Sequence, residues 1–380
     1  RWLSDWSSDV CSSDLLPRDT LPADYARLFS AFPIAATLLP LSTTGRAWIR
    51  IWDFPRVHLA ALSALCLAAL RAPRKGDAAP LDRALAVALA GCCAYQVRKI
   101  LPYTPLWRKQ VLAAGDQGRS ARIRLLTYNV YMRNRRSGEV LRMLQQAGAD
   151  VICLLEPDAW WEERLRPLER EYPHTNKCAM ENTYGMLLYS RLPLASSQTR
   201  FLVQPDVPSM RSVVRLGCGA AVALYTVHPR PPVPPVSSHG RDAELVLAGR
   251  EIAAEQLPAI ILGDLNDVAW SYTTTLFQKI SGTLDPRIGR GLYNSFHAKT
   301  ALLRFPLDHV FHTPHFTLVE LRRLERCGSD HFPILADLAY EPRRSGEQEA
   351  PAAEQEDHRQ AGEILEDAVE NGAFGPGQDP

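Results

Sequence analysis

The sequence predicts an α/β protein: a four-layer α/β sandwich of two packed β-sheets flanked by helices, preceded by an N-terminal helical hairpin. From Arg122 onward, short apolar runs alternate with longer segments of helical pattern, which is typical of mixed sheets covered by helices. The runs 151–155 and 259–262 are wholly apolar and indicate buried strands, and 241–256 indicates an amphipathic helix before the second run. Two apolar segments upstream of Arg122 supply the hairpin.

These two upstream segments, 57–70 and 84–97, contain no charged residue. As helices they would be about 21 Å long, which is shorter than the roughly 30 Å hydrocarbon core of a bilayer. Arginines at their ends could reach the polar region and lengthen the span. From length alone, a membrane hairpin and a pair of buried helices in a soluble domain are equally favoured.

The two ends of the chain are predicted to lie outside the folded core. Residues 4–15 back-translate into what resembles a sequencing-adapter read, so 1–15 are interpreted as an assembly artefact. Residues 341–380 are rich in Glu, Gln, Ala, Gly and Pro, with one short helix possible at 361–370. Such a composition predicts a disordered tail.

Charge and cysteine content narrow the function classes. The formal net charge is +1, which argues against nucleic-acid binding by overall charge alone, although 98–142 is locally basic. The chain has 8 cysteines but no Cys-x-x-Cys pair, so a zinc knuckle is not expected.

Polar motifs follow several of the predicted strands. Oxygen ligands and imidazoles at strand ends are what a divalent-metal phosphoesterase needs. One such motif occurs by chance, but an ordered set is specific. The set comprises Asn129 after Thr127-Tyr128, Glu156 after 151–155, His228 after 224–227, Gly-Asp-Leu-Asn at 263–266, Asp308 in Leu307-Asp308-His309, and Gly-Ser-Asp-His at 328–331.

Over about residues 121–340, this ordered set resembles the endonuclease/exonuclease/phosphatase (DNase-I-like) superfamily, in particular its bacterial membrane-anchored branch. The resemblance implies a metal-dependent phosphoric ester hydrolase that directs water in line at a phosphodiester or phosphomonoester. Ligands that are all oxygen favour Mg²⁺ or Mn²⁺ over zinc.

The resemblance also implies residue roles. The metal ligands would be Glu156, Asn129 and Asp330. The catalytic residues would be His331, Asp308, Asp264, His228 and Asn266, with Asp308 fixing the tautomer of His331. Substrate contacts are expected from Tyr184, Arg211 and Arg230.

Each of these residues also has an ordinary structural interpretation, such as a solvated strand end for Glu156 or an Asx-turn for Asp264 to Asn266. Asp267 is an extra carboxylate where the family usually has a small residue. His309 alternates with Asp308 and so faces the opposite side of its strand, which predicts a structural role.

The family resemblance favours a membrane hairpin over buried helices for the two upstream segments, because bacterial members often carry a transmembrane hairpin before a Tyr-Thr-Pro linker like that at 103–105. The expected location is the bacterial inner membrane. The side on which the catalytic domain lies stays undetermined, because the segments on both sides of the membrane helices are basic. The predicted domains are 1–15 (artefact), 16–100 (hydrophobic helices, membrane hairpin), 101–120 (linker), 121–340 (catalytic domain) and 341–380 (disordered tail).

The expected partners are a phosphoester substrate and membrane lipid, with nucleic acid as a further option; the sequence sets no oligomeric state. Fold alone does not choose between nucleic acid and a phospholipid or envelope phosphoester. Two competing functions remain open at this point: a catalytically silent binding module of the same superfamily, and a soluble nuclease whose apolar helices are buried.

Overall fold

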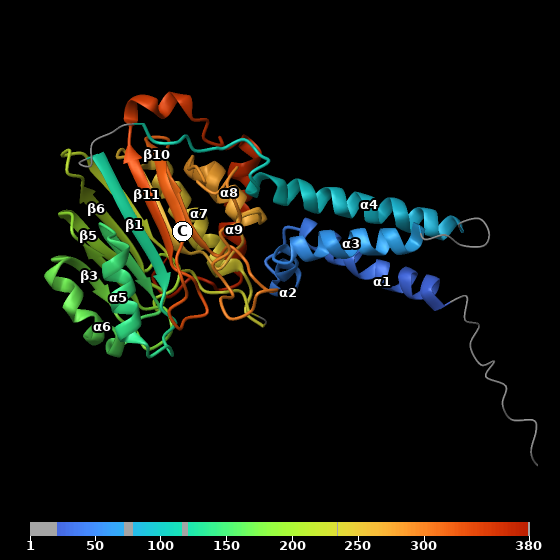
Figure 1. Cartoon of the computed structure of the whole chain (residues 1–380), viewed down its shortest axis with the longest axis horizontal. Coiled ribbons are helices and arrows are strands. Elements are labelled where there is room, and N and C mark those ends of the chain that lie inside the picture. Colours follow the sequence, from blue (N-terminus) through green and yellow to red (C-terminus); the bar gives the residue numbers. More distant parts are fainter. Residues whose placement is uncertain (1–20, 72–78, 116–120, 234, 379–380) are drawn as a thin grey trace, which may run out of the picture. The chain divides into compact units, whose positions relative to one another are not determined.

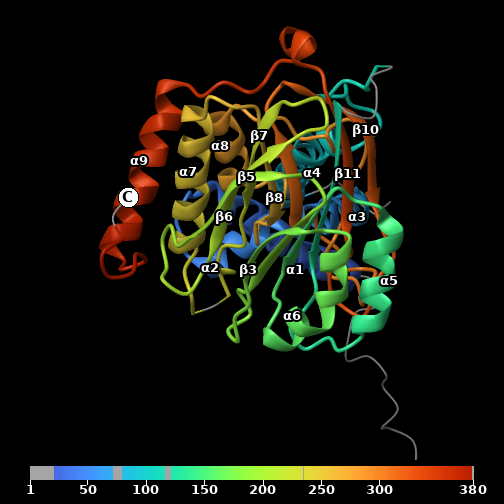
Figure 2. The same cartoon turned by 90° about the vertical axis from the view of Figure 1, so that its left-hand side faces the viewer.

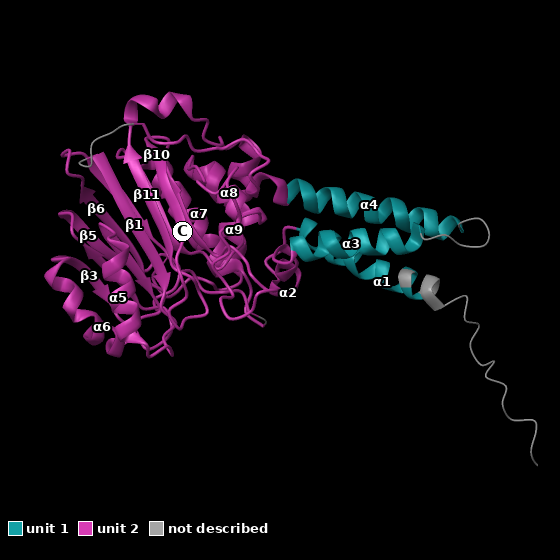
Figure 3. Cartoon of the chain, viewed as in Figure 1, with its two compact units in different colours: residues 1–42, 56–99 teal, residues 43–55, 100–380 magenta. Residues whose placement is uncertain are grey.

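The computed structural model describes residues 21–71, 79–115, 121–233 and 235–378 (Figure 1). The chain divides into two compact units (Figure 3). One comprises Arg1–Ser42 and Arg56–Lys99, and the other comprises Thr43–Pro55 and Ile100–Pro380. The predicted artefact at 1–15 lies outside the described residues.

The first unit is helical. Its apolar contacts centre on Cys66, Leu70 and Leu89, and the Ala- and Leu-rich segments favour helix. Arg56, at the start of one helix, donates to Gln96 Oε1 at 3.0 Å near the end of another, so these two helices run antiparallel, as the hairpin prediction requires. The elements are α1 (Leu21–Leu38), η1 (Leu39–Leu41), α3 (Arg56–Arg71) and α4 (Pro80–Ile100).

Helix α1 adds a third member that the hairpin prediction did not include. Gln96 of α4 donates to Thr37 Oγ1 at 2.9 Å, and Arg27 of α1 pairs with Asp82 of α4 at 2.7 Å. The helix at Pro80–Tyr103 is long and apolar enough to cross a membrane, with 24 residues and a mean hydropathy of 1.4. Among the described residues, the bent pair Ala47–Asp53 and Arg56–Arg71 meets the same criterion only if its two helices form one span. One or two such helices are weak evidence, because core helices of soluble proteins have the same character.

The second unit contains two sheets whose inner faces pack together. Leu125 and Cys153 of the first sheet share one apolar cluster with Leu224 and Ile260 of the second. The first sheet has the order β10-β11-β1-β2-β4-β3, with β1 (Arg122–Asn129), β2 (Val151–Leu155), β3 (His174–Cys178), β4 (Met186–Ser190), β10 (Phe316–Arg323) and β11 (Ile334–Tyr340). The second has the order β5-β6-β7-β8-β9, with β5 (Leu194–Arg200), β6 (Ser209–Arg215), β7 (Ala221–Thr226), β8 (Ala259–Asp264) and β9 (Asp308–His312).

Helices cover both outer faces, which confirms the predicted α/β sandwich. Figure 2 shows α7 and α8 on one side of the sheets and α5 on the other. On the first sheet, Val140 and Trp161 pack on its outer side chains, and Leu245 and Phe277 do the same on the second. The covering elements are α5 (Ser137–Ala147), α6 (Ala159–Leu165), η5 (Arg166–Arg170), α7 (His239–Ala254) and α8 (Tyr272–Ser281).

The predicted linker is, in its described part, integral to this unit. Val111 is fully buried in the core between the sheets. Tyr103 of η3 (Leu101–Tyr103) donates its hydroxyl to Ala269 O at 2.7 Å. The segment with α2 (Ala47–Arg50) and η2 (Ile51–Asp53) also belongs here, because Trp270 Nε1 donates to Asp53 O at 2.7 Å. Residues 43–55 and the described part of the predicted linker therefore group with the catalytic part of the chain, whereas the predicted boundary at 100 coincides with a boundary between the two units.

The prediction of a disordered tail is also wrong for most of its length. Residues 342–347 form η6 (Pro342–Glu347), and α9 (Gln355–Glu370) lies along α7 and α8 with Leu365 buried. The helix begins with a capping box between Glu354 and Asp357, and Asp357 pairs with Lys279 of α8 at 2.8 Å. Apolar residues at helical spacing gave α9 a buried stripe despite its low average hydrophobicity.

Candidate active site

The sequence motifs lie where strands end at one edge of the two sheets. Strands β1 and β2 are parallel neighbours, and Asn129 closes the first while Glu156 follows the second. In the other sheet, β8 and β9 pair Asp264 directly with Asp308. Asn129, Asp264 and Asp308 each continue the period-two series of side chains that face the opposite sheet, so they point toward a common space.

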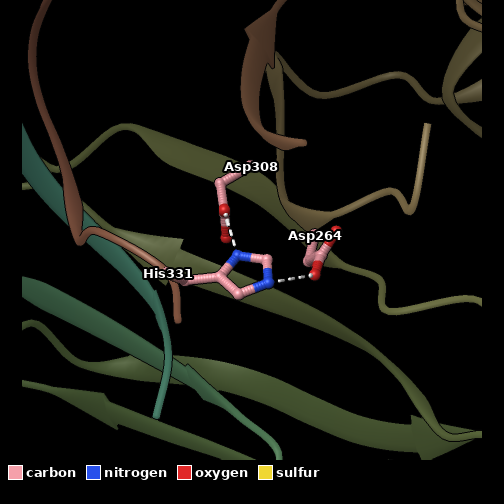
Figure 4. Close-up of side chains that lie close together, drawn as sticks. All are labelled: Asp264, Asp308 and His331. Atoms are coloured by element: carbon pink, nitrogen blue, oxygen red, sulfur yellow. Dashed lines mark hydrogen bonds and ion pairs between the residues drawn. The ribbon is translucent and has the colours of Figure 1, made fainter. Parts of the chain in front are cut away.

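Asp264, Asp308 and His331 form a contiguous cluster, called here the His–Asp cluster (Figure 4). His331 Nδ1 lies 2.7 Å from Asp308 Oδ2, and Nε2 lies 3.4 Å from Asp264 Oδ2. Burial alone would lower the pKa of His331, but the two aspartates outweigh burial and raise the pKa to about 10. At neutral pH this histidine is therefore an imidazolium held between two carboxylates.

Asn129, Glu156 and Asp330 form a second group, called here the acidic group. Asn129 Nδ2 donates to Glu156 Oε1 at 2.8 Å, and the Met132 amide donates to Glu156 Oε2 at 3.3 Å. Burial raises the pKa of Glu156, and the charge of Asp330 raises it further, so the two carboxylates lie within electrostatic reach. Glu156 has a φ of 62°, an uncommon backbone conformation for a residue with a side chain.

His228 and Asn266 border the His–Asp cluster. His228 Nε2 lies 3.8 Å from Asp264 Oδ2, and burial lowers the pKa of this histidine, so it is neutral at pH 7. The side chain of Asn266 donates to Pro229 O at 2.9 Å, next to His228 in the chain. Position 263, at the end of β8, requires glycine, because a Cβ there would lie 1.9 Å from the carbonyl oxygen of Val227, the residue that follows β7.

Of the three predicted substrate contacts, Tyr184 and Arg230 lie beside His228. The rings of Tyr184 and His228 are 5.7 Å apart, and the Arg230 guanidinium lies 5.3 Å from the Tyr184 ring centroid. Arg230 also pairs with the partly exposed Asp206 at 2.7 Å. These two side chains extend the site on the side of His228.

The structure contradicts the prediction that Arg211 lines the cleft. Arg211 forms an ion pair with Glu255, just after α7, and its Nε donates to Tyr225 OH at 3.2 Å. Tyr225 belongs to the apolar cluster on the helix-covered face of the sheet. Because neighbouring strand residues alternate faces, Arg211 lies on the opposite face from Asp264 and serves packing.

Sequence reasoning missed supporting residues around His331. Ser329 accepts from the His331 amide at 3.0 Å and donates to Asn129 O at 2.7 Å, so it joins the two groups of the site. Ser295 accepts from the Asp308 amide at 2.9 Å. Phe296 places its ring 4.9 Å from that of His331. Ser329 stood inside the quoted Gly-Ser-Asp-His motif, whereas Ser295 and Phe296 lie in an irregular segment without any signal.

Residues 126–331 match the model of the Endonuclease/Exonuclease/phosphatase family, and the chain belongs to this family. No curated protein sequence matches the chain. A protein of this family from Beutenbergia cavernae is similar in structure, with 17% identity, a TM-score of 0.49 and coverage of 58% of this chain and 72% of that one. One from Bacteroides vulgatus has 19% identity and a TM-score of 0.47, covering 58% and 99%. TDP2 from D. rerio, solved with a single-strand DNA product, has 16% identity and a TM-score of 0.48, covering 57% and 99%.

The two groups differ in how well they fit a metal ion. Asp264, Asp308 and His331 offer ligand atoms within 4.8 Å of one another. However, His331 is protonated on both ring nitrogens at neutral pH and has no lone pair to offer. Each oxygen of Glu156 accepts one N–H and keeps a lone pair free. With Asp330, the acidic group supplies hard oxygen donors of the kind that Mg²⁺ and Mn²⁺ prefer.

Proposed function

We propose that this protein is a membrane-anchored, Mg²⁺- or Mn²⁺-dependent phosphoesterase that hydrolyses a phosphodiester or phosphomonoester by in-line attack of water. The observation that carries the proposal is the position of His331 between Asp308, 2.7 Å from Nδ1, and Asp264, 3.4 Å from Nε2, within electrostatic reach of Glu156. A buried cation and a buried base next to an oxygen-rich group are what phosphoryl transfer to water requires.

The His–Asp cluster would carry the proton chemistry and much of the charge stabilisation. Asp264 has a pKa raised by burial, which makes its carboxylate a better base for a water molecule. His331 would place positive charge against the phosphoryl oxygens, where negative charge grows in the transition state. Asp308 fixes the ring of His331 through Nδ1 and so keeps the other ring edge directed at the reacting group.

The acidic group would hold the metal. Glu156 and Asp330 would supply carboxylate oxygens, while Asn129 as placed contacts Glu156 through its amide nitrogen and orients that carboxylate. A bound divalent cation would neutralise charge on the phosphoryl oxygens. His228 and Asn266 would contact the phosphoryl group, and Tyr184 with Arg230 would contact the adjoining part of the substrate.

The proposed membrane anchoring is supported by the exposed apolar side chains of helices α3 and α4 in the first unit. Leu65 is 67% exposed and Val87 is 74% exposed, so both helices present large apolar side chains outward. An anchored enzyme at the bacterial inner membrane would meet phospholipids and envelope phosphoesters, and nucleic acid is the other substrate class to test. After carbonate extraction, an anchored protein stays with the membrane fraction, whereas a soluble nuclease is released.

The proposal is tested with the full-length protein in detergent. DNA, RNA, a sphingomyelin-like lipid and inositol phosphates are each incubated with the protein, with Mg²⁺ and after chelation. Hydrolysis of at least one class, lost on chelation and absent from His331→Ala, supports the proposal. Binding without hydrolysis of any class indicates a silent binding module, and hydrolysis that survives chelation contradicts the metal-dependent mechanism.

A further inference from the structure

The last residue of β8, Asp264, and the three residues that follow it form a short turn at 264–267, called here the catalytic loop, whose backbone is held from the helix-covered side of the sheet. The loop turns sharply, because Asn266 adopts a φ of 50°. The side chain of Asp264 faces the site, whereas Leu265 packs in the apolar cluster on the helix-covered face, and the Asn266 amide donates to Asp264 Oδ1 at 2.9 Å. The carbonyl oxygens of Asn266 and Asp267 each accept a hydrogen bond from a buried side chain.

Arg241 provides the first of these two contacts. It lies in α7, is only 1% exposed, and its Nη1 donates to Asn266 O at 3.0 Å. The rest of its guanidinium is occupied: Nε and Nη2 donate to Asp242 Oδ1 at 2.9 and 2.7 Å, and Nη2 lies 3.5 Å from Asp267 Oδ2. A buried arginine with this set of partners has little freedom to rotate, so it fixes the carbonyl that it contacts.

His309 provides the second contact, and its tautomer follows from its partners. Arg287 Nη2 lies 2.6 Å from His309 Nδ1, and His309 Nε2 lies 2.9 Å from Asp267 O. A guanidinium can only donate and a carbonyl can only accept, so Nδ1 is the acceptor and Nε2 carries the proton. Burial, helped by the charge of Arg287, lowers the pKa of His309 well below 6.5, which agrees with a neutral ring. Asp285 in turn holds Arg287 at 2.8 Å.

The extra carboxylate of Asp267 belongs to the same arrangement. Its Oδ2 accepts from Ser271 Oγ at 2.6 Å and its Oδ1 accepts from the Val268 amide at 2.9 Å. It is 1% exposed and is engaged on the outer side of the loop, away from the His–Asp cluster. Asp267 is therefore part of the support for the loop.

We propose that Arg241 and His309 are positioning residues for hydrolysis: by fixing two successive carbonyl groups of the catalytic loop, they hold Asp264 and Asn266 in their reactive orientation. The inference rests on the proposed function. A positive φ at a residue with a side chain is disfavoured in a free chain, so the turn at Asn266 persists because its surroundings hold it. A displacement of about 1 Å in a reacting group can cost on the order of 10²-fold in rate.

The test uses paired substitutions in the full chain. His309→Phe keeps an aromatic ring but removes the donor to Asp267 O, whereas His309→Gln supplies an amide that can donate to Asp267 and accept from Arg287. Arg241→Met removes the donor to Asn266 O, and Arg241→Lys retains one donor. The matched control is Arg211→Met, which removes another arginine on the same face of the sheet that makes no contact with the loop.

We expect His309→Phe and Arg241→Met to lower kcat by roughly 10- to 100-fold, with KM changed less than about twofold. Hydrogen exchange of the 264–268 amides should quicken in both variants. The melting temperature should change little in His309→Phe but fall in Arg241→Met, because that change leaves the buried carboxylates of Asp242 and Asp267 without their cation. His309→Gln and Arg241→Lys should recover much of kcat and of the protection, and Arg211→Met should leave both unchanged.

Folded variants that keep kcat and slow exchange in the loop would overturn the inference. If Arg241→Met does not fold, the comparison of His309→Phe with His309→Gln decides alone. A protein without any hydrolytic activity refutes the proposed function, but the exchange rates still show whether Arg241 and His309 hold the loop.

Discussion

The His–Asp cluster and the acidic group contain the same kinds of oxygen atom but differ in what surrounds them. In the first, Asp264 and Asp308 face the two ring nitrogens of one histidine, which supplies the positive charge from within the protein. In the second, Glu156 accepts only neutral N–H donors, and its neighbour Asp330 is another carboxylate. Under the proposed function, this difference gives the two groups different roles: the His–Asp cluster would carry the proton transfer, and the acidic group would hold a divalent cation.

The largest effect on catalysis is expected from removing the positive charge of the His–Asp cluster. His331→Ala should lower kcat by several orders of magnitude, because it removes both the positioned donor and the charge opposite the phosphoryl oxygens. Steady-state kinetics on the best substrate of the panel measures this loss, with circular dichroism as the control for folding. Near-normal activity would show that the His–Asp cluster is not the reacting centre.

A smaller loss is expected when His331 keeps its place but loses its partner charge. Asp308→Asn should lower kcat on the order of 10²-fold, since an amide can hold the ring in the wrong tautomer and does not stabilise the imidazolium. KM and the melting temperature should change little. If this variant instead unfolds, Asp308 supports the fold and its catalytic role must be withdrawn.

The metal-binding role proposed for the acidic group is tested by measuring its affinity for Mg²⁺. Glu156→Gln keeps the size of the side chain but removes its charge and one of its two acceptor oxygens, so Mg²⁺ should bind at least roughly 10-fold more weakly. Calorimetric titration of the protein with Mg²⁺ measures this directly, and the melting temperature without metal is the control. Unchanged Mg²⁺ affinity would place the metal elsewhere and break the division of the site into two halves.

Glu244 is a buried carboxylate outside both groups, and burial changes its pKa with little compensation from neighbouring charges. Substituting it should affect stability and leave activity unchanged. Burial raises the pKa of Glu244 from its ordinary 4.5 to about 8, and the charge of Arg200 offsets only part of this shift. Between these pH values the folded protein keeps a proton that the unfolded chain releases, so stability falls as pH rises from 4.5 to 8.

Glu244→Gln removes this titration. Relative to the parent protein, the variant should gain little at pH 4.5 and roughly 2–4 kcal/mol in free energy of unfolding at pH 8. Urea denaturation at both pH values measures the difference. A gain that is equal at the two pH values would contradict a raised pKa at this position, and activity should not change at either pH.

Local patterns predicted most of the fold and the placement of the site, for a clear physical reason. Apolar runs mark buried strands, and polar residues that directly follow them, such as Asn129 and Asp264, must lie at a sheet edge. Because side chains alternate between the two faces of a strand, the sequence alone places Asp308 and His309 on opposite faces of the sheet. The same parity test was available for Arg211 and would have removed it, because it alternates with Met210 and Ser212, which point inward.

Long-range packing accounts for what the sequence did not predict. The sequence around Asp53 and Val111 contains no pattern that predicts packing against the catalytic unit, because their partners lie far away in the chain. The buried contacts of Arg241 likewise depend on a loop that follows 25 positions later. Helix α9 was expected only as a possible short helix at 361–370 within a disordered tail, because the low average hydrophobicity of the tail does not reveal the few apolar residues that the helix buries.

We propose above that this site hydrolyses a phosphoester with a metal ion in the acidic group and with His331 as the positive charge. Release of nitrophenol from bis-p-nitrophenyl phosphate by the full-length protein tests it most directly, with Mg²⁺, with chelator, and with His331→Ala. We expect release that requires Mg²⁺, stops on chelation and returns when metal is restored, with His331→Ala at background. Release that continues with chelator present, or that is equal in His331→Ala, would contradict it.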